Sequence, residues 1–267
     1  MGQKKKNQMN YLEELYSLEN QTAVVIGGGG VLAGCMAEGL AKAGANLAIL
    51  DLNMENAQKK ADELKELGVK TSAIKVDAAS KTDLEKAADQ IVKEFGSMDI
   101  LINAPGINSA TPFLEITEEE YQKIMDVNLK SMFLACQIFG KKIIDQGRGG
   151  SIINIASVSS GPPLSRVFTY SVSKAGVANL TQFLAKDWAP YNIRVNALAP
   201  GFFPAEQNRK ILTKERVDSI MNHTPMNRFG DPEELIGATI WLASGKASSF
   251  VTGAIIRVDG GYTAMTI

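Results

Sequence analysis

Two residues that lie four positions apart, Tyr170 and Lys174, have side chains that could act as an acid/base pair. Four residues make about one helical turn, so the phenol and the ammonium lie on the same face of a helix. A free tyrosine titrates near ~10, and a nearby positive charge favours the phenolate, which would bring that pKa towards neutral. Upstream, Ser157 closes the apolar run 151–157 and could present a hydroxyl at the end of a buried strand. The same spacing also occurs in many surface helices, so the pair alone does not define a site.

These residues need a scaffold, and from position 22 onward short β-branched runs alternate with amphipathic stretches. The runs that predict strands are 22–26, 47–50, 72–76, 100–103, 151–155 and 193–197. The clearest helical patterns between them are 54–67, 83–95, 118–139 and 170–188. This alternation predicts an α/β fold with a doubly wound parallel sheet, helices on both faces, and ligands at the carboxyl ends of the strands.

The organisation of the chain predicts one domain over 18–267, preceded by a tail and short helix over 1–17. No repeat, low-complexity block or Pro/Ser-rich linker divides it. The least regular segment, 201–225, follows a predicted strand and precedes Asp231-Pro-Glu-Glu, a good helix start. We expect this segment to be a substrate lid of short helices.

The composition argues against several kinds of partner. The 267 residues are 45% hydrophobic and 21% charged, with a net charge of −1 and a pI near 6.0, which gives no general attraction to nucleic acid or to anionic membranes. Cys35 and Cys136 lie in apolar helical stretches without metal-ligand spacing, which predicts buried free thiols and neither a disulfide nor a metal site. No apolar run reaches the ~18 residues of a membrane helix, and the N-terminus is too polar for a signal peptide, so we expect a cytoplasmic protein.

A glycine cluster over 27–34 joins the first predicted strand to the first predicted helix. At this position a glycine turn allows backbone N–H groups and the helix N-terminus to bind a pyrophosphate. Taken alone, the cluster could also be only a tight turn. Its place between a strand and a helix favours a dinucleotide cofactor.

The second predicted strand ends at Asp51, 24 residues after Gly27, close to the spacing of an acid that accepts the ribose hydroxyls of NAD. A carboxylate there repels a 2′-phosphate, and neither Gly30 nor Leu52 supplies a cation to hold one. We therefore expect NAD rather than NADP. The alternative is that Asp51 only ends its strand or caps the next helix.

Together, these features resemble the short-chain dehydrogenase/reductase family over nearly the whole chain. The motifs that carry the resemblance are the glycine turn, Asp51, Asp77, Asp99-Ile-Leu-Ile-Asn103, Asp126-Val-Asn-Leu129, Ser157, Tyr170 with Lys174, Arg194-Val-Asn-Ala-Leu-Ala-Pro-Gly201 and Asp259-Gly-Gly. The resemblance implies a Rossmann fold with a seven-stranded parallel sheet in the order 3-2-1-4-5-6-7, assembled as a homotetramer or homodimer. It implies no metal.

The resemblance also implies roles for individual residues. Tyr170 would be the general acid/base, Ser157 would bind the reacting oxygen, Lys174 would bind the nicotinamide ribose and lower the pKa of Tyr170, and Asn128 would hold a water for proton exchange. The residues expected at the cofactor are Gly27, Gly29, Gly30, Val31, Leu32, Asp51, Leu52, Asp77, Ala78, Asn103, Ala104, Tyr170, Lys174, Pro200, Gly201 and Phe203.

Three positions depart from the family pattern. Two later glycines of the TGxxxGxG turn are replaced, so Gly34 follows one residue late. The usual Asn-Asn-Ala-Gly is Asn103-Ala-Pro-Gly106, in which the proline removes one N–H and stiffens the wall beside the cofactor. Ala205 stands where many members carry a threonine that contacts the nicotinamide amide.

The segments expected to choose the substrate are polar. Residues 163–166 and 202–209 resemble the subgroup that reduces fructuronate to mannonate and, more broadly, the sugar-acid and polyol dehydrogenases. A guanidinium fork suits a carboxylate, so Arg166 and Arg209 could bind an anionic substrate, although surface salt bridges are the alternative for both. The residues expected at the substrate are Ser157, Ser159, Arg166, Gln207, Asn208 and Arg209.

The sequence thus favours an NAD-dependent oxidoreductase that interconverts an alcohol and a ketone on a sugar acid or related polyhydroxylated anion. The alternative within the family is a 3-oxoacyl or general ketone reductase, which usually takes NADPH. A protein of another class, one that binds NAD without catalysis, is disfavoured by the complete set of catalytic residues. The single histidine, His223, lies in the expected lid and is either a surface residue or a hydrogen-bond partner of the substrate.

Overall fold

The computed structural model describes residues 10–204 and 212–264. Its centre is a seven-stranded parallel sheet in the order β3-β2-β1-β4-β5-β6-β7, which confirms the predicted fold. The strands are β1 (Thr22–Ile26), β2 (Asn46–Asp51), β3 (Thr71–Lys75), β4 (Ile100–Asn103), β5 (Gly150–Ile155), β6 (Ile193–Pro200) and β7 (Ile255–Val258). Each run predicted to be a strand overlaps one of these.

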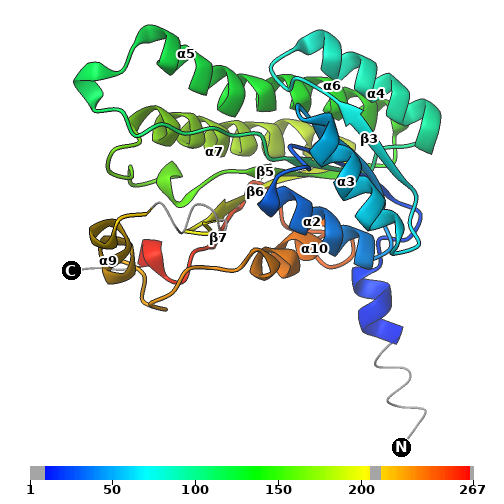
Figure 1. Cartoon of the computed structure of the whole chain (residues 1–267). Helices are drawn as coiled ribbons and strands as arrows, with labels where there is room; N and C mark the ends of the chain where they lie inside the picture. The colour runs from blue at the N-terminus through cyan, green and yellow to red at the C-terminus, as the bar shows by residue number, and fades with distance from the viewer. Residues whose placement is uncertain (1–9, 205–211, 265–267) are drawn as a thin grey trace, which may run out of the picture.

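Helices cover both faces of the sheet (Figure 1). One layer contains α4 (Lys81–Phe95), α6 (Ser131–Gln146) and α7 (Phe168–Trp188), and the other contains α2 (Val31–Lys42), α3 (Met54–Lys65) and α10 (Ile236–Ala243). Alternate residues of a strand point to opposite faces, so the β1 side chains divide between the two cores: Val24 packs with the first layer and Val25 with the second. This double burial explains why the strands are continuous apolar runs.

The long helical segment before β5 contains a change of winding. The sequence predicted one helix over 118–139, and the structure has α5 (Glu118–Met125), a π-helical turn η2 (Asp126–Lys130) and then α6. Here α5 packs against α7, whereas α6 packs against α4. Single π turns inside α-helices are frequent at functional sites, and this one carries Asn128.

The described part of the expected lid contains one helix, α9 (Lys214–Asn222), which Thr213 caps by accepting a hydrogen bond from Arg216 N–H at 3.3 Å. The short 3-10 helices are η1 (Phe113–Glu115), η3 (Val158–Ser160), η4 (Ala189–Tyr191), η5 (Pro232–Leu235) and η6 (Tyr262–Ala264). Residues 10–16 are helical as well, and Ser244 Oγ donates a hydrogen bond to Leu15 O at 2.6 Å. Within 10–204 and 212–264, no helix has the length and apolar character needed to span a membrane.

Candidate active site

The acid/base pair lies in the first two turns of α7, facing the carboxyl end of β5. Lys174 is 3% exposed, and its Nζ donates a hydrogen bond to Ile155 O at 2.7 Å. The same Nζ lies 5.7 Å from the centroid of the Tyr170 ring. The strand end and the helix therefore hold the ammonium beside the phenol, as the spacing in the sequence indicated.

The pKa values of this pair shift in directions set by burial. Burial lowers the pKa of Lys174 to about 8. It raises the pKa of the Tyr170 phenol, and a hydrogen bond with the Ser157 hydroxyl opposes that rise. The sequence led us to expect a lowered tyrosine pKa; in the structure, loss of hydration outweighs the hydrogen bond that favours the phenolate.

Ser157 is positioned by a local hydrogen-bonded cap that follows β5. Its Oγ accepts from Ser159 N–H at 3.2 Å, while Ser160 Oγ accepts from Ser157 N–H at 3.2 Å. This reciprocal capping starts η3 and fixes the Ser157 side chain, which is 6% exposed. The hydroxyl is thus held near Tyr170 before any substrate is present.

Asn128 is fully buried in the π turn, with both ends of its amide engaged. Its Oδ1 accepts from Ile107 N–H at 2.8 Å, and its Nδ2 donates to Ile107 O at 2.9 Å and to Ser173 Oγ at 3.1 Å. A Cβ placed on Gly106 would lie 3.5 Å from Lys174 Nζ and 3.8 Å from Asn128 Oδ1. The two side chains therefore approach the same point, and the glycine leaves room beside them.

The glycine turn fits a bound dinucleotide in spite of its altered pattern. Gly27 has a φ of +78°, and a Cβ there would meet Ala104 C at 3.2 Å. A Cβ on Gly29 would lie 2.8 Å from the Asn56 Cβ. The chain then enters α2 through Gly30, which supplies no side-chain cap, so the first N–H groups of the helix are left for an anion.

Asp51 ends β2 beside this turn. Its Oδ2 accepts a hydrogen bond from Gly29 N–H at 3.0 Å and its Oδ1 accepts one from Asn53 N–H at 2.9 Å. The carboxylate therefore holds the glycine turn in place, a role the sequence did not suggest. Leu52 is 64% exposed beside it.

The remaining residues expected at the cofactor lie along the same edge of the sheet, with one qualification. Asn103 is fully buried, and its Nδ2 donates to Asn154 Oδ1 at 2.9 Å, so its side chain points into the core between sheet and helices and not towards the edge. Asp77 follows β3, where its Oδ1 accepts from Ala79 N–H. The others, by position, are Val31 and Leu32 at the start of α2, Ala78 after β3, Ala104 after β4, and Pro200, Gly201 and Phe203 at and after the end of β6.

A cavity of about 580 Å³ opens beside the acid/base pair. Ser157, Arg166, Tyr170, Gly201 and Phe203 all line it, as expected for substrate and nicotinamide contacts. Ser159 does not: it is 1% exposed, because it lies inside η3 and packs against the body of the protein. Gln207, Asn208 and Arg209, together with Ala205, lie outside the described residues.

The sequence analysis named neither Asn108 nor Arg216 as a site residue, although both line the cavity, and it named Ser165 only as part of the segment 163–166. Arg216 is in the first turn of α9, and its Nη1 donates a hydrogen bond to Ser165 Oγ at 2.9 Å. Thr213 is a typical N-cap residue and indicates a helix start just before Arg216, but nothing in the sequence places that helix beside residue 165.

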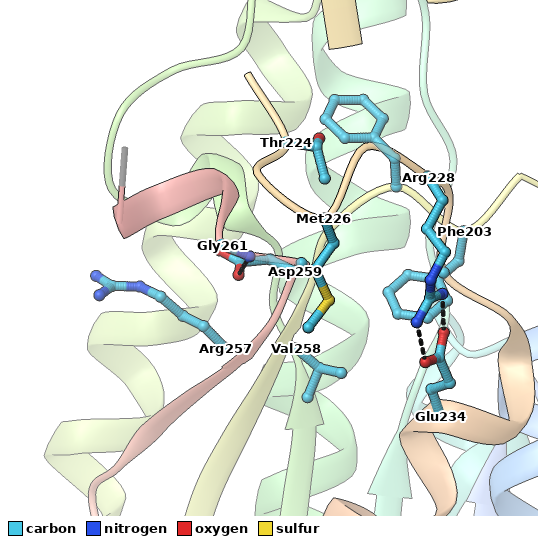
Figure 2. A pocket seen from close by; sticks show the side chains of 12 residues that line it. Phe203, Thr224, Met226, Arg228, Glu234, Arg257, Val258, Asp259 and Gly261 are labelled. Atoms are coloured by element: carbon cyan, nitrogen blue, oxygen red, sulfur yellow. Dashed lines mark hydrogen bonds and ion pairs between the residues drawn. The ribbon is translucent and has the colours of Figure 1, made fainter. Parts of the chain in front are cut away.

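A second cavity of about 380 Å³ adjoins the first, and Phe202 and Phe203 line both (Figure 2). Its charged groups are largely paired. Arg228 donates from Nη1 and Nη2 to the two carboxylate oxygens of Glu234, each at 2.7 Å, and Asp259 accepts from the backbone of Gly261 at 2.9 Å.

This geometry defines a class of protein. A glycine turn for a dinucleotide, a buried serine and lysine and a half-buried tyrosine meet at the carboxyl edge of a Rossmann-type sheet, as in a nucleotide-dependent oxidoreductase. A family model described as Enoyl-(Acyl carrier protein) reductase matches residues 30–263. The chain belongs to the short-chain dehydrogenase/reductase family.

Three related proteins illustrate the similarity. The 2-dehydro-3-deoxy-D-gluconate 5-dehydrogenase of Escherichia coli (strain K12) is 37% identical over 93% of this chain and 98% of its own length. The structure of a gluconate 5-dehydrogenase from Burkholderia cenocepacia J2315 with NADP and tartrate has a TM-score of 0.90 at 34% identity, and covers 96% of this chain and 100% of that one. A Haemophilus influenza protein with bound NAD, provisionally named D-mannonate oxidoreductase, has a TM-score of 0.90 at 35% identity, covering 96% and 99%.

Proposed function

We propose that this protein interconverts a secondary alcohol and a ketone on a sugar acid, using NAD. The observation that carries the proposal is the arrangement of Ser157 and Tyr170, with Lys174 beside them, at a cavity that two arginines line. The three relatives support the substrate class, because each is named for a sugar acid.

The reaction divides between the cofactor and the side chains. When bound, the nicotinamide supplies or accepts the hydride. Ser157 donates a hydrogen bond to the reacting oxygen, and Tyr170 gives a proton to that oxygen in reduction or takes it in oxidation. The raised pKa keeps the phenol protonated at neutral pH, the form needed for reduction. Lys174, charged below its pKa of about 8, places a positive charge beside the phenolate that oxidation requires.

The preference for NAD follows from Asp51. With its carboxylate fixed by Gly29 and Asn53 N–H groups, the 2′-position of an adenosine ribose would meet a negative charge. Leu52 supplies no cation that could bind a 2′-phosphate. The relatives bind either cofactor, so the proposal depends on these residues and not on the comparisons.

The test is a turnover screen at 340 nm with D-gluconate, D-mannonate and their 5-keto or uronate partners, each with NAD(H) and NADP(H). D-glucitol and D-mannitol serve as neutral counterparts of the same chain length. We expect turnover of at least one acid with NAD(H) and at least ten times lower kcat/KM with NADP(H). Turnover of the neutral polyols alone would contradict the proposal.

A second function is favoured by one observation, the description of the matching family model. A 3-oxoacyl or enoyl thioester reductase would reduce acetoacetyl-CoA or crotonyl-CoA with NADPH. The cavity has apolar side chains in its wall, but Arg166 and Arg216 also line it and would place two cations beside an acyl chain. We therefore include both thioesters in the screen and expect no turnover.

We also propose a single catalytic domain over 18–267 after an N-terminal segment, with 201–225 as its lid, assembled as a homotetramer or homodimer in the cytoplasm. Apolar side chains exposed on the long helices support assembly: Phe133 is 44% exposed on α6 and Phe183 is 63% exposed on α7. Both cysteines are buried and unpaired, which is typical of a reducing compartment. Light scattering of the purified protein would give the oligomer count.

A further inference from the structure

Two guanidinium groups of the catalytic cavity have no anionic partner among the described residues. The Arg166 side chain makes neither a hydrogen bond nor an ion pair with a described residue, and the Arg216 side chain makes one hydrogen bond, to the neutral Ser165 hydroxyl at 2.9 Å. An arginine presents five N–H donors and stays charged at any ordinary pH, so most of the donors here are available to a ligand.

The neighbouring cavity contains one paired arginine. There, Arg228 forms a two-pronged ion pair with Glu234, as Figure 2 shows. Arg257 also lines that cavity and makes no ion pair with a described residue. In the catalytic cavity, neither Arg166 nor Arg216 forms an ion pair with a described residue.

The two arginines come from separate segments that one hydrogen bond links. Arg216 is half-buried in the first turn of α9, a helix anchored by its buried residue Ile220. Arg166 lies four residues before Tyr170 and has a φ of +72°, an uncommon backbone conformation for a residue with a side chain. Ser165 joins them, since it precedes Arg166 and accepts the hydrogen bond of Arg216.

We propose that Arg216, with Arg166, binds the carboxylate of the substrate and makes the enzyme select acids over neutral polyols. This inference rests on the proposed function and adds the residue that sets its substrate class. The reacting carbon lies at Ser157 and Tyr170, and the carboxylate lies at the end of the cavity formed by Ser165, Arg166 and Arg216. A guanidinium fork matches a carboxylate through two parallel hydrogen bonds, which a hydroxymethyl group cannot form.

The experiment compares Arg216→Met, Arg216→Lys and the wild type on two pairs of substrates, D-gluconate with D-glucitol and D-mannonate with D-mannitol. Each pair differs only in a carboxylate replaced by a hydroxymethyl group. For the acid, we expect Arg216→Met to raise KM about 10- to 100-fold with kcat within about threefold, because a charge-assisted hydrogen bond is lost. For the polyol, the KM and kcat of Arg216→Met should stay within about twofold of the wild-type values. Arg216→Lys should recover part of the loss, since it keeps the charge without the fork.

The matched control is Lys214→Met, which removes an exposed cation from the same turn of α9 outside the cavity. Its KM for the acid should stay within about twofold of the wild type. NADH affinity, followed by fluorescence, should be unchanged in all variants, which shows that they are folded and bind the cofactor.

The outcomes separate the two proposals. If the wild type prefers acids and Arg216→Met keeps that preference, the assignment of Arg216 is wrong and the proposed function stands. An equal rise in KM for acid and polyol shows a structural role and also overturns the assignment. A wild type that treats acids and polyols alike overturns the assignment of Arg216 and leaves the proposed function standing, whereas a wild type that turns over none of these acids overturns both.

Discussion

Replacing Lys174 by methionine should stabilise the protein while it removes catalysis. The ammonium is 3% exposed, and burial lowers its pKa from 10.5 to about 8. One pKa unit corresponds to ~1.4 kcal/mol, so at pH 7 the charged lysine costs about 3 kcal/mol of unfolding free energy. The variant also loses the hydrogen bond to Ile155 O, worth about 1 kcal/mol. We expect a net gain of about 2 kcal/mol at pH 7.

The stability of the wild type should depend on pH, because the pKa of Lys174 is lower in the folded protein than in the unfolded chain. Between pH 8 and 10.5 the folded wild type binds fewer protons at Lys174 than the unfolded chain does, so its stability rises with pH over that window. By pH 9.5 the cost of the charge falls to about 1 kcal/mol, and the advantage of Lys174→Met should largely disappear.

The assay is urea unfolding followed by circular dichroism, at one protein concentration and at pH 7.0 and 9.5. Lys186→Met, which removes an exposed lysine from the same helix, serves as the control and should change stability by less than about 0.5 kcal/mol. A Lys174→Met variant less stable than the wild type at pH 7, or one with the same advantage at both pH values, would refute the reasoning.

Three further predictions concern the proton, the cofactor and helix packing. Tyr170→Phe should lose at least about 1,000-fold in kcat and keep its NADH affinity, measured by fluorescence; near-normal turnover would remove the tyrosine from the mechanism. Asp51→Ala combined with Leu52→Arg should raise kcat/KM for NADP relative to NAD at least about tenfold, and an unchanged ratio would count against the ribose contact. In Gly140→Ala, the new Cβ would lie 2.4 Å from the tryptophan that ends α7, so we expect a loss of about 1–3 kcal/mol in urea unfolding. Gly237→Ala, in a helix with open space around the Cβ, is its control and should cost nothing.

Much of the fold could be predicted, because buried parallel strands and amphipathic helices have different periodicities. Local spacing alone predicted that Ser157 lies at the end of a strand and that Tyr170 lies one helical turn before Lys174. The π turn could not be predicted, since α5 has one buried residue, Ile124, and a single position does not reveal a change in the phase of the apolar pattern. Nor could the sequence reveal that Ser159 is buried or that Arg216 reaches Ser165, a contact across 51 positions, because both depend on how η3 and α9 pack.

The π turn also sets the rotational phase between two helices. Each residue advances a helix by about 100°, so the extra residue in Asp126–Lys130 rotates α5 relative to α6 by roughly that angle. This offset lets α5 lie on α7 with Ile124 buried, while α6 faces α4. Deleting one residue from the turn would restore a regular helix and swing Ile124 away from its buried position. The segment that holds Asn128 is therefore constrained in length as well as in sequence, and it joins the catalytic centre to the outer surface of the helical layer.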